Sequence, residues 1–300
     1  MCVPPSTIPA RNWTSYAALG DSFTEGLVDE VAADGRHVGW ADRLAVELAR
    51  RAEERGESGI RYANLAVRGR LTRQVVREQV PVALRLRPQL ASLAVGVNDT
   101  LRPRFDLDVV ATALESGVRD LRGSGADVLI FAFGDPVRRS LAMSGIRDRI
   151  RGYNSAVHAI AGAYGCYVVD FWQVAAYDDD RLWDEDRLHL SPAGHRLAAR
   201  TALDALGLGD GDWRTPEVPA DRAPLHQRAG THARWATGHL APWVLRRVRR
   251  ASSGDGIDPK FPAWVPVTAA GIGRPAAIPG AIPGAIPGAP AAVAGTEKVK

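Results

Sequence analysis

Residue types that together can activate a hydroxyl group occur in two short stretches of this 300-residue chain. Residues 18–26 read ALGDSFTEG, which places Ser22 on a sharp turn directly after a short apolar run. Residues 186–189 read DRLH and supply a carboxylate, Asp186, and an imidazole, His189, three positions apart. A serine hydroxyl becomes a good nucleophile when a base lies within hydrogen-bond reach and a carboxylate orients that base. The two stretches therefore contain the three groups that serine-dependent hydrolysis requires.

Two further stretches contain groups that could bind a developing negative charge. Gly69 follows Asn64-Leu65-Ala66 after a few residues, and Asn98 lies within Gly96-Val97-Asn98-Asp99. A glycine lets the backbone approach a ligand closely because it has no Cβ. An asparagine amide donates hydrogen bonds without a charge that must be desolvated. Both are suited to an oxyanion-binding site.

Ser, Gly, Asn and His occur in that chain order, and on these four blocks the sequence resembles the SGNH (GDSL-type) hydrolases. The resemblance covers roughly residues 14–208. It implies an α/β fold, namely a flavodoxin-like three-layer α/β/α sandwich with a central parallel sheet. One departure is that the turn reads Gly-Asp-Ser-Phe where the family's name has Leu. We expect Phe23 to pack against the protein rather than to react.

The resemblance also implies a reaction and the roles of the site residues. The reaction is hydrolysis of a carboxylic ester through an acyl-serine intermediate. Ser22 would be the nucleophile, His189 the general base and then acid, and Asp186 the carboxylate that orients the imidazole. The backbone N–H groups of Ser22 and Gly69 and the side-chain amide of Asn98 would form the oxyanion hole. No metal or organic cofactor is expected, and the expected partner is a small-molecule ester.

Short apolar runs alternate with longer amphipathic runs from Ser15 to about Gly209. Strands are predicted over residues 16–19, 61–65, 90–95, 127–133 and 166–171. Helices are predicted over residues 40–55, 72–86, 109–121, 146–164 and 191–206. This alternation predicts parallel βαβ units, in which ligands bind beyond the carboxyl ends of the strands. Ser22, Gly69 and Asn98 each follow a predicted strand, so we expect them at the same edge of the sheet.

Each candidate site residue also has a structural interpretation. Ser22 could be a turn serine or the N-cap of a helix. Gly69 could be a strand-end glycine that needs a positive φ. Asn98 and Asp99 could form an Asx turn, and Asp99 is expected to be structural.

Other polar residues near the motifs are expected to be structural rather than catalytic. His195 competes with His189 but falls inside the closing helix, which favours a structural or surface role. Asp21 is expected to fix the loop beside the nucleophile. The acidic residues 178–180 and 184–186 around Trp183 are interpreted as a solvated loop, and no metal site is predicted from them.

The composition divides the chain into four regions: an N-terminal arm (1–13), a hydrolase-like domain (14–209), a basic extension (210–251) and a Pro/Gly/Ala-rich tail (252–300) that is expected to be disordered. Residues 277–288 repeat Ala-Ile-Pro-Gly three times, and such a segment has too little apolar surface to bury. Residues 239–250 read HLAPWVLRRVRR, a basic segment that could form a short helix. It could dock through Trp243 on the domain, or make weak contact with an anionic membrane surface.

Charge is distributed unevenly along the chain. Residues 1–210 carry 26 basic and 28 acidic side chains, whereas residues 211–300 carry 12 basic and 6 acidic ones. The formal charge of +4 therefore comes from the C-terminal part, and the domain gives no reason to expect a nucleic-acid partner. Two cysteines, Cys2 and Cys166, do not predict a disulfide framework. We see neither a signal peptide nor an apolar run of about 18 residues, so a cytoplasmic location is expected.

Two alternatives to ester hydrolysis remain open from the sequence. An acyltransferase or a carbohydrate deacetylase could use the same triad, because the outcome depends on how well water is excluded from the acyl-enzyme. A non-catalytic surface-binding protein could also keep this fold, since one scaffold serves many functions.

Overall fold

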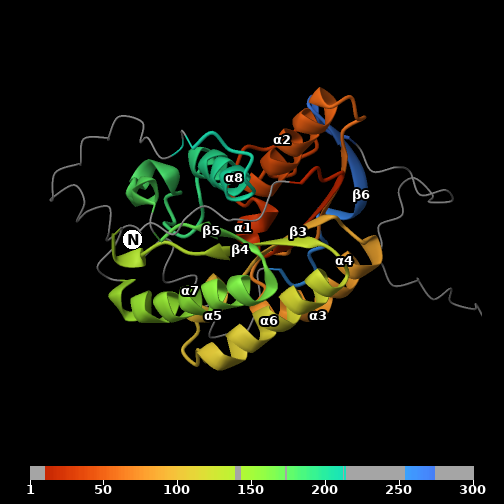
Figure 1. Cartoon of the computed structure of the whole chain (residues 1–300). Coiled ribbons are helices and arrows are strands. Elements are labelled where there is room, and N and C mark those ends of the chain that lie inside the picture. Colours follow the sequence, from red (N-terminus) through yellow and green to blue (C-terminus); the bar gives the residue numbers. More distant parts are fainter. Residues whose placement is uncertain (1–10, 139–142, 173, 212, 214–253, 274–300) are drawn as a thin grey trace, which may run out of the picture.

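A seven-stranded mixed sheet forms the centre of the molecule (Figure 1). The computed structural model describes residues 11–138, 143–172, 174–211, 213 and 254–273. The strands run in the order β5-β4-β3-β1-β2-β6-β7, and β1 to β5 are parallel. Their bounds are β1 (Ser15–Gly20), β2 (Ile60–Asn64), β3 (Leu90–Ala94), β4 (Asp127–Ala132), β5 (Tyr167–Asp170), β6 (Phe261–Thr268) and β7 (Gly271–Ile272).

Helices cover both faces of this sheet, as the resemblance predicted. Helices α2 and α8 pack on one face, and α3, α4, α6 and α7 pack on the other (Figure 1). The helices are α1 (Ser22–Glu25), α2 (Trp40–Glu54), α3 (Thr72–Glu78), α4 (Val80–Leu86), α5 (Val97–Thr100), α6 (Leu107–Gly123), α7 (Ser144–Tyr164) and α8 (Pro192–Ala205). Short 3-10 turns are η1 (Pro136–Arg138), η3 (Ala175–Asp178) and η4 (Asp180–Leu182). The flavodoxin-like α/β/α sandwich is confirmed.

Strands β1, β3 and β4 are buried at every position and are largely apolar because both of their faces are covered. In β1, Tyr16 and Ala18 belong to the core under α2 and α8, whereas Ala17 and Leu19 belong to the opposite core. Side chains alternate between the two faces of a strand, so a strand covered on both sides reads as a continuous apolar run. This explains why the short apolar runs predicted the five parallel strands within one or two residues of their bounds.

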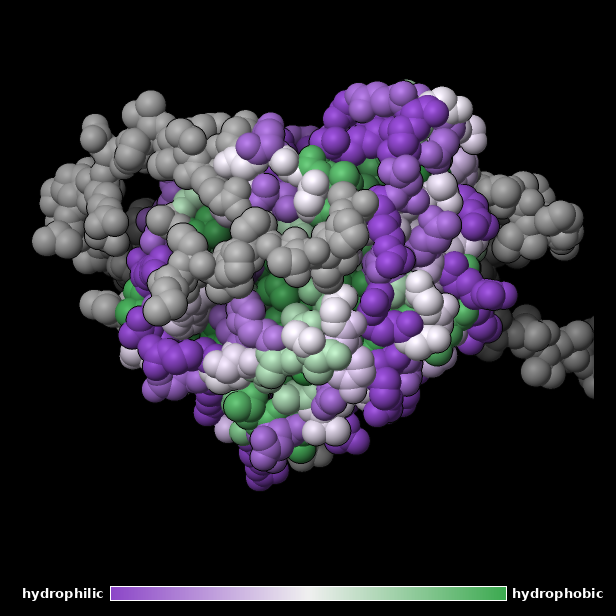
Figure 2. Space-filling view, in the orientation of Figure 1, coloured by the Kyte–Doolittle hydropathy of each residue, from purple (hydrophilic) through white to green (hydrophobic). Residues whose placement is uncertain are grey.

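Helix α2 shows the opposite pattern, with one buried and one charged face. Trp40, Leu44 and Leu48 are buried at helical spacing, and the helix ends in a charged run of Arg and Glu residues. Figure 2 shows a largely hydrophilic surface over this part of the molecule. Amphipathic spacing of this kind buries one stripe of a helix against a sheet.

One predicted helix is two helices in the structure. The prediction of a single helix over residues 72–86 is wrong, because α3 ends at Glu78 and α4 begins at Val80. Pro81 lies in the first turn of α4 and has no N–H to continue the hydrogen-bond ladder of α3. The residue at the break, Gln79, is buried and turns its side chain toward β1.

The prediction that residues 252–300 are disordered is wrong for residues 261–272. Strand β6 pairs antiparallel with β2, and β7 pairs antiparallel with β6. Phe261, Val265 and Val267 are buried, so the strand places one face on the core. The Pro/Gly/Ala-rich composition concealed this strand, but its two prolines are tolerated because, in the part of the chain that the structure describes, β7 pairs only with Val267 and Thr268 and leaves the rest of the outer side of β6 open. The repeat at residues 277–288, most of the basic extension including residues 239–250, and most of the N-terminal arm lie outside the described residues.

The strand order reverses between β1 and β3. The chain passes from β1 to β2 on one side and then returns to place β3 on the other side of β1. Ligands in open α/β sheets bind at the carboxyl ends of the strands at this reversal. Helix α1 follows β1 and α5 follows β3, so Ser22 of α1 and Asn98 of α5 meet at this reversal. Among the described residues, no helix is long and apolar enough to cross a membrane.

Candidate active site

Ser22 is the first residue of α1, in a turn that is fixed on several sides. The Asp21 side chain caps the helix by accepting a hydrogen bond from the Phe23 backbone N–H at 3.1 Å. Gly20 closes β1 so tightly that a Cβ there would lie 2.6 Å from the Ala94 carbonyl oxygen. In Gly-Asp-Ser, the glycine thus allows a close backbone approach, the aspartate caps the helix, and the serine presents a half-buried hydroxyl.

Gln79 holds this turn from the opposite side of β1. Its side chain accepts a hydrogen bond from the Gly20 N–H at 2.8 Å and donates one to the Gly20 carbonyl at 2.9 Å. The buried amide therefore pairs with Gly20 as a neighbouring strand would, immediately before the Ser22 turn. Buried backbone groups without partners are costly, so this contact stabilises the turn.

Asp186 and His189 lie on a loop that forms its own local structure. Trp183 and Leu190 form an isolated antiparallel bridge across the base of the loop. One Asp186 oxygen accepts hydrogen bonds from the backbone N–H groups of Leu188 and His189, both at 2.9 Å. The turn between them needs a left-handed residue, and Arg187 has φ +56°. The three-residue spacing of the motif is thus the spacing of an Asx-type turn.

The structure brings Ser22, His189 and Asp186 together. His189 Nε2 lies 3.0 Å from Ser22 Oγ, and His189 Nδ1 lies 2.5 Å from Asp186 Oδ2. Both side chains of the loop remain 19% exposed, so a substrate has access to the imidazole. Burial alone would raise the pKa of Asp186, but hydrogen bonds and charge from His189 lower it to about 2. A carboxylate that stays ionised can fix the imidazole tautomer and stabilise its protonated form.

Gly69 and Asn98 lie beside the Ser22 turn, as the sequence predicted. Asn98 Nδ2 donates to Asp21 Oδ2 at 2.8 Å and to the Arg70 carbonyl at 3.2 Å. Gly69 has φ +74°, a conformation that favours glycine. Its neighbour Arg68 is bound to the α1 residue Glu25, since the Arg68 N–H donates to Glu25 Oε2 at 2.7 Å and the side chains form an ion pair.

Two carboxylates next to these residues have structural roles. Burial raises the pKa of Asp21 to about 6, although the hydrogen bonds it accepts and the charge of His189 oppose this shift. Asp99 Oδ2 accepts hydrogen bonds from the Thr72 backbone N–H at 3.0 Å and from its hydroxyl at 2.9 Å. Asp21 therefore links the Ser22 turn to Asn98, and Asp99 fixes the start of α3. Both contacts are of the structural kind expected for these residues.

His195 is structural, and it is buried rather than on the surface. Its Nδ1 lies 3.3 Å from the Trp40 backbone nitrogen, and its Nε2 lies 3.1 Å from the Leu27 carbonyl oxygen. Burial lowers its pKa to about 4. The ring also stacks on Phe23 at 6.4 Å, and Phe23 stacks on Trp40 at 5.4 Å. Phe23 therefore packs in an aromatic cluster, as expected.

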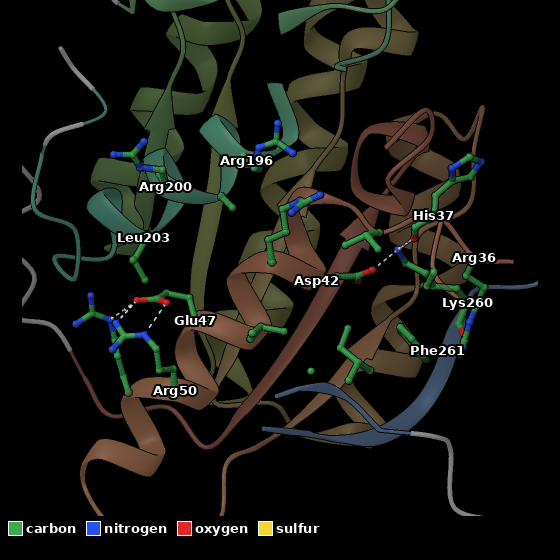
Figure 3. A pocket seen from close by; sticks show the side chains of 18 of the residues that line it. Arg36, His37, Asp42, Glu47, Arg50, Arg196, Arg200, Leu203, Lys260 and Phe261 are labelled. Atoms are coloured by element: carbon green, nitrogen blue, oxygen red, sulfur yellow. Dashed lines mark hydrogen bonds and ion pairs between the residues drawn. The ribbon is translucent and has the colours of Figure 1, made fainter. Parts of the chain in front are cut away.

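A cavity of 730 Å³ lies apart from these residues, between α2, α8 and the C-terminal strands (Figure 3). Its lining includes arginines from both helices, and none of the three triad residues lines it. Figure 3 shows Arg50 paired with Glu47 and Lys260 paired with Asp42. Many of its charges are thus matched within the lining. The geometry around Ser22, rather than the size of this cavity, locates the candidate active site.

The acidic loop residues do not form a metal site in the part of the chain that the structure describes, where no group of three or more candidate ligands is found. Asp179 pairs with Arg181 at 2.5 Å, and Asp178 lies 3.6 Å from Arg138. These carboxylates are engaged by arginines.

The fold is a flavodoxin-like α/β/α sandwich, and its candidate site holds a serine, a histidine and an aspartate in hydrogen-bond contact, as in serine-dependent hydrolases. The sequence profile of the GDSL-like lipase/acylhydrolase family matches residues 18–197, and this chain belongs to that family of ester-hydrolysing enzymes. A search of the curated proteins finds no match.

Solved structures share the fold. The α/β hydrolase LAE5 from the metagenome of Lake Arreo, Spain, aligns with a TM-score of 0.54 at 20% identity and covers 65% of this chain and 95% of its own. Axe2, an acetylxylan esterase from Geobacillus stearothermophilus, aligns with a TM-score of 0.53 at 21% identity, covering 65% and 94%. TesA gives a TM-score of 0.52 at 18% identity, covering 64% and 97%.

Proposed function

We propose that this protein is a serine esterase that hydrolyses carboxylic esters through an acyl-serine intermediate. The observation that carries the proposal is the hydrogen-bonded chain from Ser22 Oγ through the His189 ring to Asp186. This chain lies at the strand-order reversal, where α/β sheets bind ligands.

In the first half-reaction, His189 Nε2 takes the proton of Ser22 Oγ as the oxygen attacks the ester carbonyl carbon. The tetrahedral intermediate collapses when His189 returns that proton to the leaving alcohol, and the acyl group stays on Ser22. Water then attacks the acyl-serine with His189 again as base, which releases the acid and restores the hydroxyl. Asp186 remains ionised throughout and holds the imidazole tautomer.

The oxyanion hole in this proposal consists of the Ser22 N–H, the Gly69 N–H and Asn98 Nδ2. Asn98 already donates to Asp21 at 2.8 Å and to the Arg70 carbonyl at 3.2 Å. We infer that the shorter bond anchors the amide and that the substrate oxygen replaces the longer one. Charge-assisted hydrogen bonds are the stronger kind, and Asp21 is the charged partner when it is ionised.

The test is hydrolysis of p-nitrophenyl esters from acetyl to palmitoyl by the wild type, by Ser22→Ala and by Ser155→Ala. Ser155 is an exposed serine on α7 and serves as the matched control. We expect kcat to fall by about 10⁴- to 10⁶-fold in Ser22→Ala and to stay at the wild-type value in Ser155→Ala. Undiminished activity in a folded Ser22→Ala protein would contradict the proposal.

The same series separates hydrolysis from the two alternatives. A new ester formed with an added alcohol identifies acyl transfer, and acetate released from an acetylated carbohydrate identifies deacetylation. A folded wild type that turns over none of these substrates would favour a binding function.

A further inference from the structure

The C-terminal segment reaches the loop that carries Gly69. Gly254 is buried, whereas the next four residues, 255–258, are exposed. A Cβ built on Gly254 would lie 2.1 Å from the Arg68 carbonyl oxygen, 3.2 Å from the Arg68 carbonyl carbon and 2.9 Å from Val67 Cγ1. Gly254 does not have a positive φ, so it is the close contact, rather than the backbone conformation, that requires a glycine there.

The carbonyl group in this contact belongs to the peptide bond that contains the Gly69 N–H. A trans peptide is planar, and its C=O and N–H point in opposite directions. There are no cis peptide bonds among the described residues. Gly254 therefore packs on the carbonyl side of the Arg68–Gly69 peptide, and the Gly69 N–H points away from Gly254.

The same segment is attached a second time, at Lys260, and hydrogen bonds lead from there to α1 and to the loop that carries Gly69. Lys260 Nζ donates to Asp42 Oδ2 at 2.6 Å, and both side chains are buried, with 7% and 5% exposure. Tyr62 donates to the other Asp42 oxygen at 2.7 Å and accepts a hydrogen bond from Asn64 Nδ2 at 2.9 Å. A buried charge needs its partner, so Lys260 stabilises this network.

Asn64 connects the network to the two elements of the site. Its Nδ2 donates to the Thr24 carbonyl of α1 at 3.1 Å, and its Oδ1 accepts from the Ala66 N–H at 3.1 Å. Ala66 lies three residues before Gly69 on the same loop. The segment thus contacts this loop directly at Gly254 and through side chains from Lys260.

We propose that residues 254–260 are a positioning element for ester hydrolysis, in which Gly254 holds the Arg68–Gly69 peptide so that the Gly69 N–H faces the oxyanion. This inference rests on the proposed function, because it assigns to that peptide the role of oxyanion donor. Asp255 adds an ion pair to Arg70 at 3.4 Å, but Asp255 is 64% exposed and contributes little.

The test is a graded series, Gly254→Ala and Gly254→Val, with Gly162→Ala as the matched control. Gly162 lies within α7, and a Cβ there would meet nothing within 4 Å. Loss of one oxyanion donor lowers the rate by about 100- to 1,000-fold. We expect kcat for the best p-nitrophenyl ester to fall by about 10- to 100-fold in Gly254→Ala and further in Gly254→Val, because a displaced donor is weakened before it is lost. KM should change by less than about threefold, since the donor acts mainly in the transition state.

Two measurements separate positioning from a general loss of structure. Phenylboronic acid forms a tetrahedral adduct with a reactive serine, so its inhibition constant should rise in parallel with the loss of kcat. Hydrogen exchange of the peptide covering residues 65–71 should become faster in the Gly254 variants and stay unchanged in Gly162→Ala. The inhibition constant does not depend on the fraction of protein that is active, and exchange in peptides outside residues 65–71 shows whether the rest of the molecule stays folded.

The outcomes distinguish failure of this inference from failure of the proposed function. An active wild type with unchanged kcat, boronate inhibition and exchange in the Gly254 variants would overturn the positioning role. Faster exchange without a loss of kcat would overturn it as well. A wild type that hydrolyses no ester and binds no boronate would overturn the proposed function, while the exchange data would still decide whether Gly254 holds the loop.

Discussion

The Ser22 turn and the Asp186–His189 loop meet at one hydrogen bond, yet different parts of the molecule hold them. The Ser22 turn is connected to β2 through Asn64, to α5 through Asn98, and to the break between α3 and α4 through Gln79. The Asp186–His189 loop is organised mainly by its own backbone, with the bridge at its base and the turn around Asp186. In this molecule, the nucleophile is fixed by the core and the base is fixed by local turn chemistry.

This difference predicts that substitutions in the two regions will separate activity from stability. Changes in the loop should lower turnover and leave the free energy of unfolding nearly unchanged. Changes that remove the hydrogen bonds holding the Ser22 turn should lower both. Asp186→Asn and Gln79→Met test this contrast, and His195→Gln and Phe23→Leu sharpen it by changing rings that pack beside the turn.

Asp186→Asn is expected to have the largest effect and to act on activity alone. The amide keeps an oxygen for the Leu188 and His189 N–H groups but favours the wrong imidazole tautomer, so kcat should fall by about 10³- to 10⁴-fold. The free energy of unfolding should change by less than about 1 kcal/mol, since the loop hydrogen bonds remain. Ester kinetics and urea unfolding measure both quantities. Asp180→Asn, an exposed residue of the same acidic run, is the control, and a large loss of stability in Asp186→Asn would break the contrast.

Gln79→Met should lower stability and activity together. The variant leaves the Gly20 N–H without its side-chain partner and the Gly20 carbonyl with the Val67 N–H at 3.3 Å, which costs about 1–3 kcal/mol. We expect kcat to fall by about tenfold or more because the nucleophile turn shifts. Urea unfolding and ester kinetics are compared with Arg73→Met, which removes an exposed side chain from α3. A stable Gln79→Met enzyme with full turnover would show that the turn does not depend on this contact.

His195→Gln should change how stability depends on pH. The folded pKa of about 4 lies below the ordinary value of 6.5, so the unfolded state binds more protons between these pH values. The contribution of the buried neutral ring to the free energy of unfolding is fully present above pH 6.5. It is lost as the pH falls through 4, by on the order of 3 kcal/mol, because the unfolded state is protonated first. The raised pKa of Asp21 acts in the opposite direction but is common to both proteins. Unfolding from pH 7 to pH 4 should show a smaller loss in His195→Gln, and parallel curves would contradict the prediction.

Phe23→Leu should have the smallest effect. It introduces the residue found in the family's name and removes ring contacts with Trp40 and Phe131, at a cost of about 1 kcal/mol. We expect kcat to stay within about threefold of the wild type because the ring packs away from the reaction. Thermal unfolding and ester kinetics check this. A change of more than tenfold in kcat at unchanged stability would mean that the ring contacts substrate.

The sequence predicted the parallel part of the fold because its signals are local. Continuous apolar runs mark strands buried on both faces, and Ser22, Gly69 and Asn98 follow such strands within five residues. The motif spacing of Asp186 and His189 is also local, since one Asx-type turn sets it.

What the sequence did not predict depends on contacts between distant residues. Gln79 meets Gly20, Glu25 meets Arg68, and Lys260 meets Asp42, and no periodicity or spacing relates these pairs. Strand β6 was missed for the same reason, since its partner β2 lies about 200 residues earlier in the chain. The break between α3 and α4 did have a local signal in Pro81, which the helical spacing around it outweighed.

The late position of β6 has a consequence for synthesis of the chain. Ile60 pairs with Val267, so β2 remains an open sheet edge until residues 261–268 have left the ribosome. Unpaired edges of this kind are sites of intermolecular strand pairing, and N-terminal segments emerge first during translation. Until then, the nascent protein carries its Ser22 turn on an incomplete sheet. Nascent chains at this stage are where we expect self-association and dependence on chaperones to be greatest.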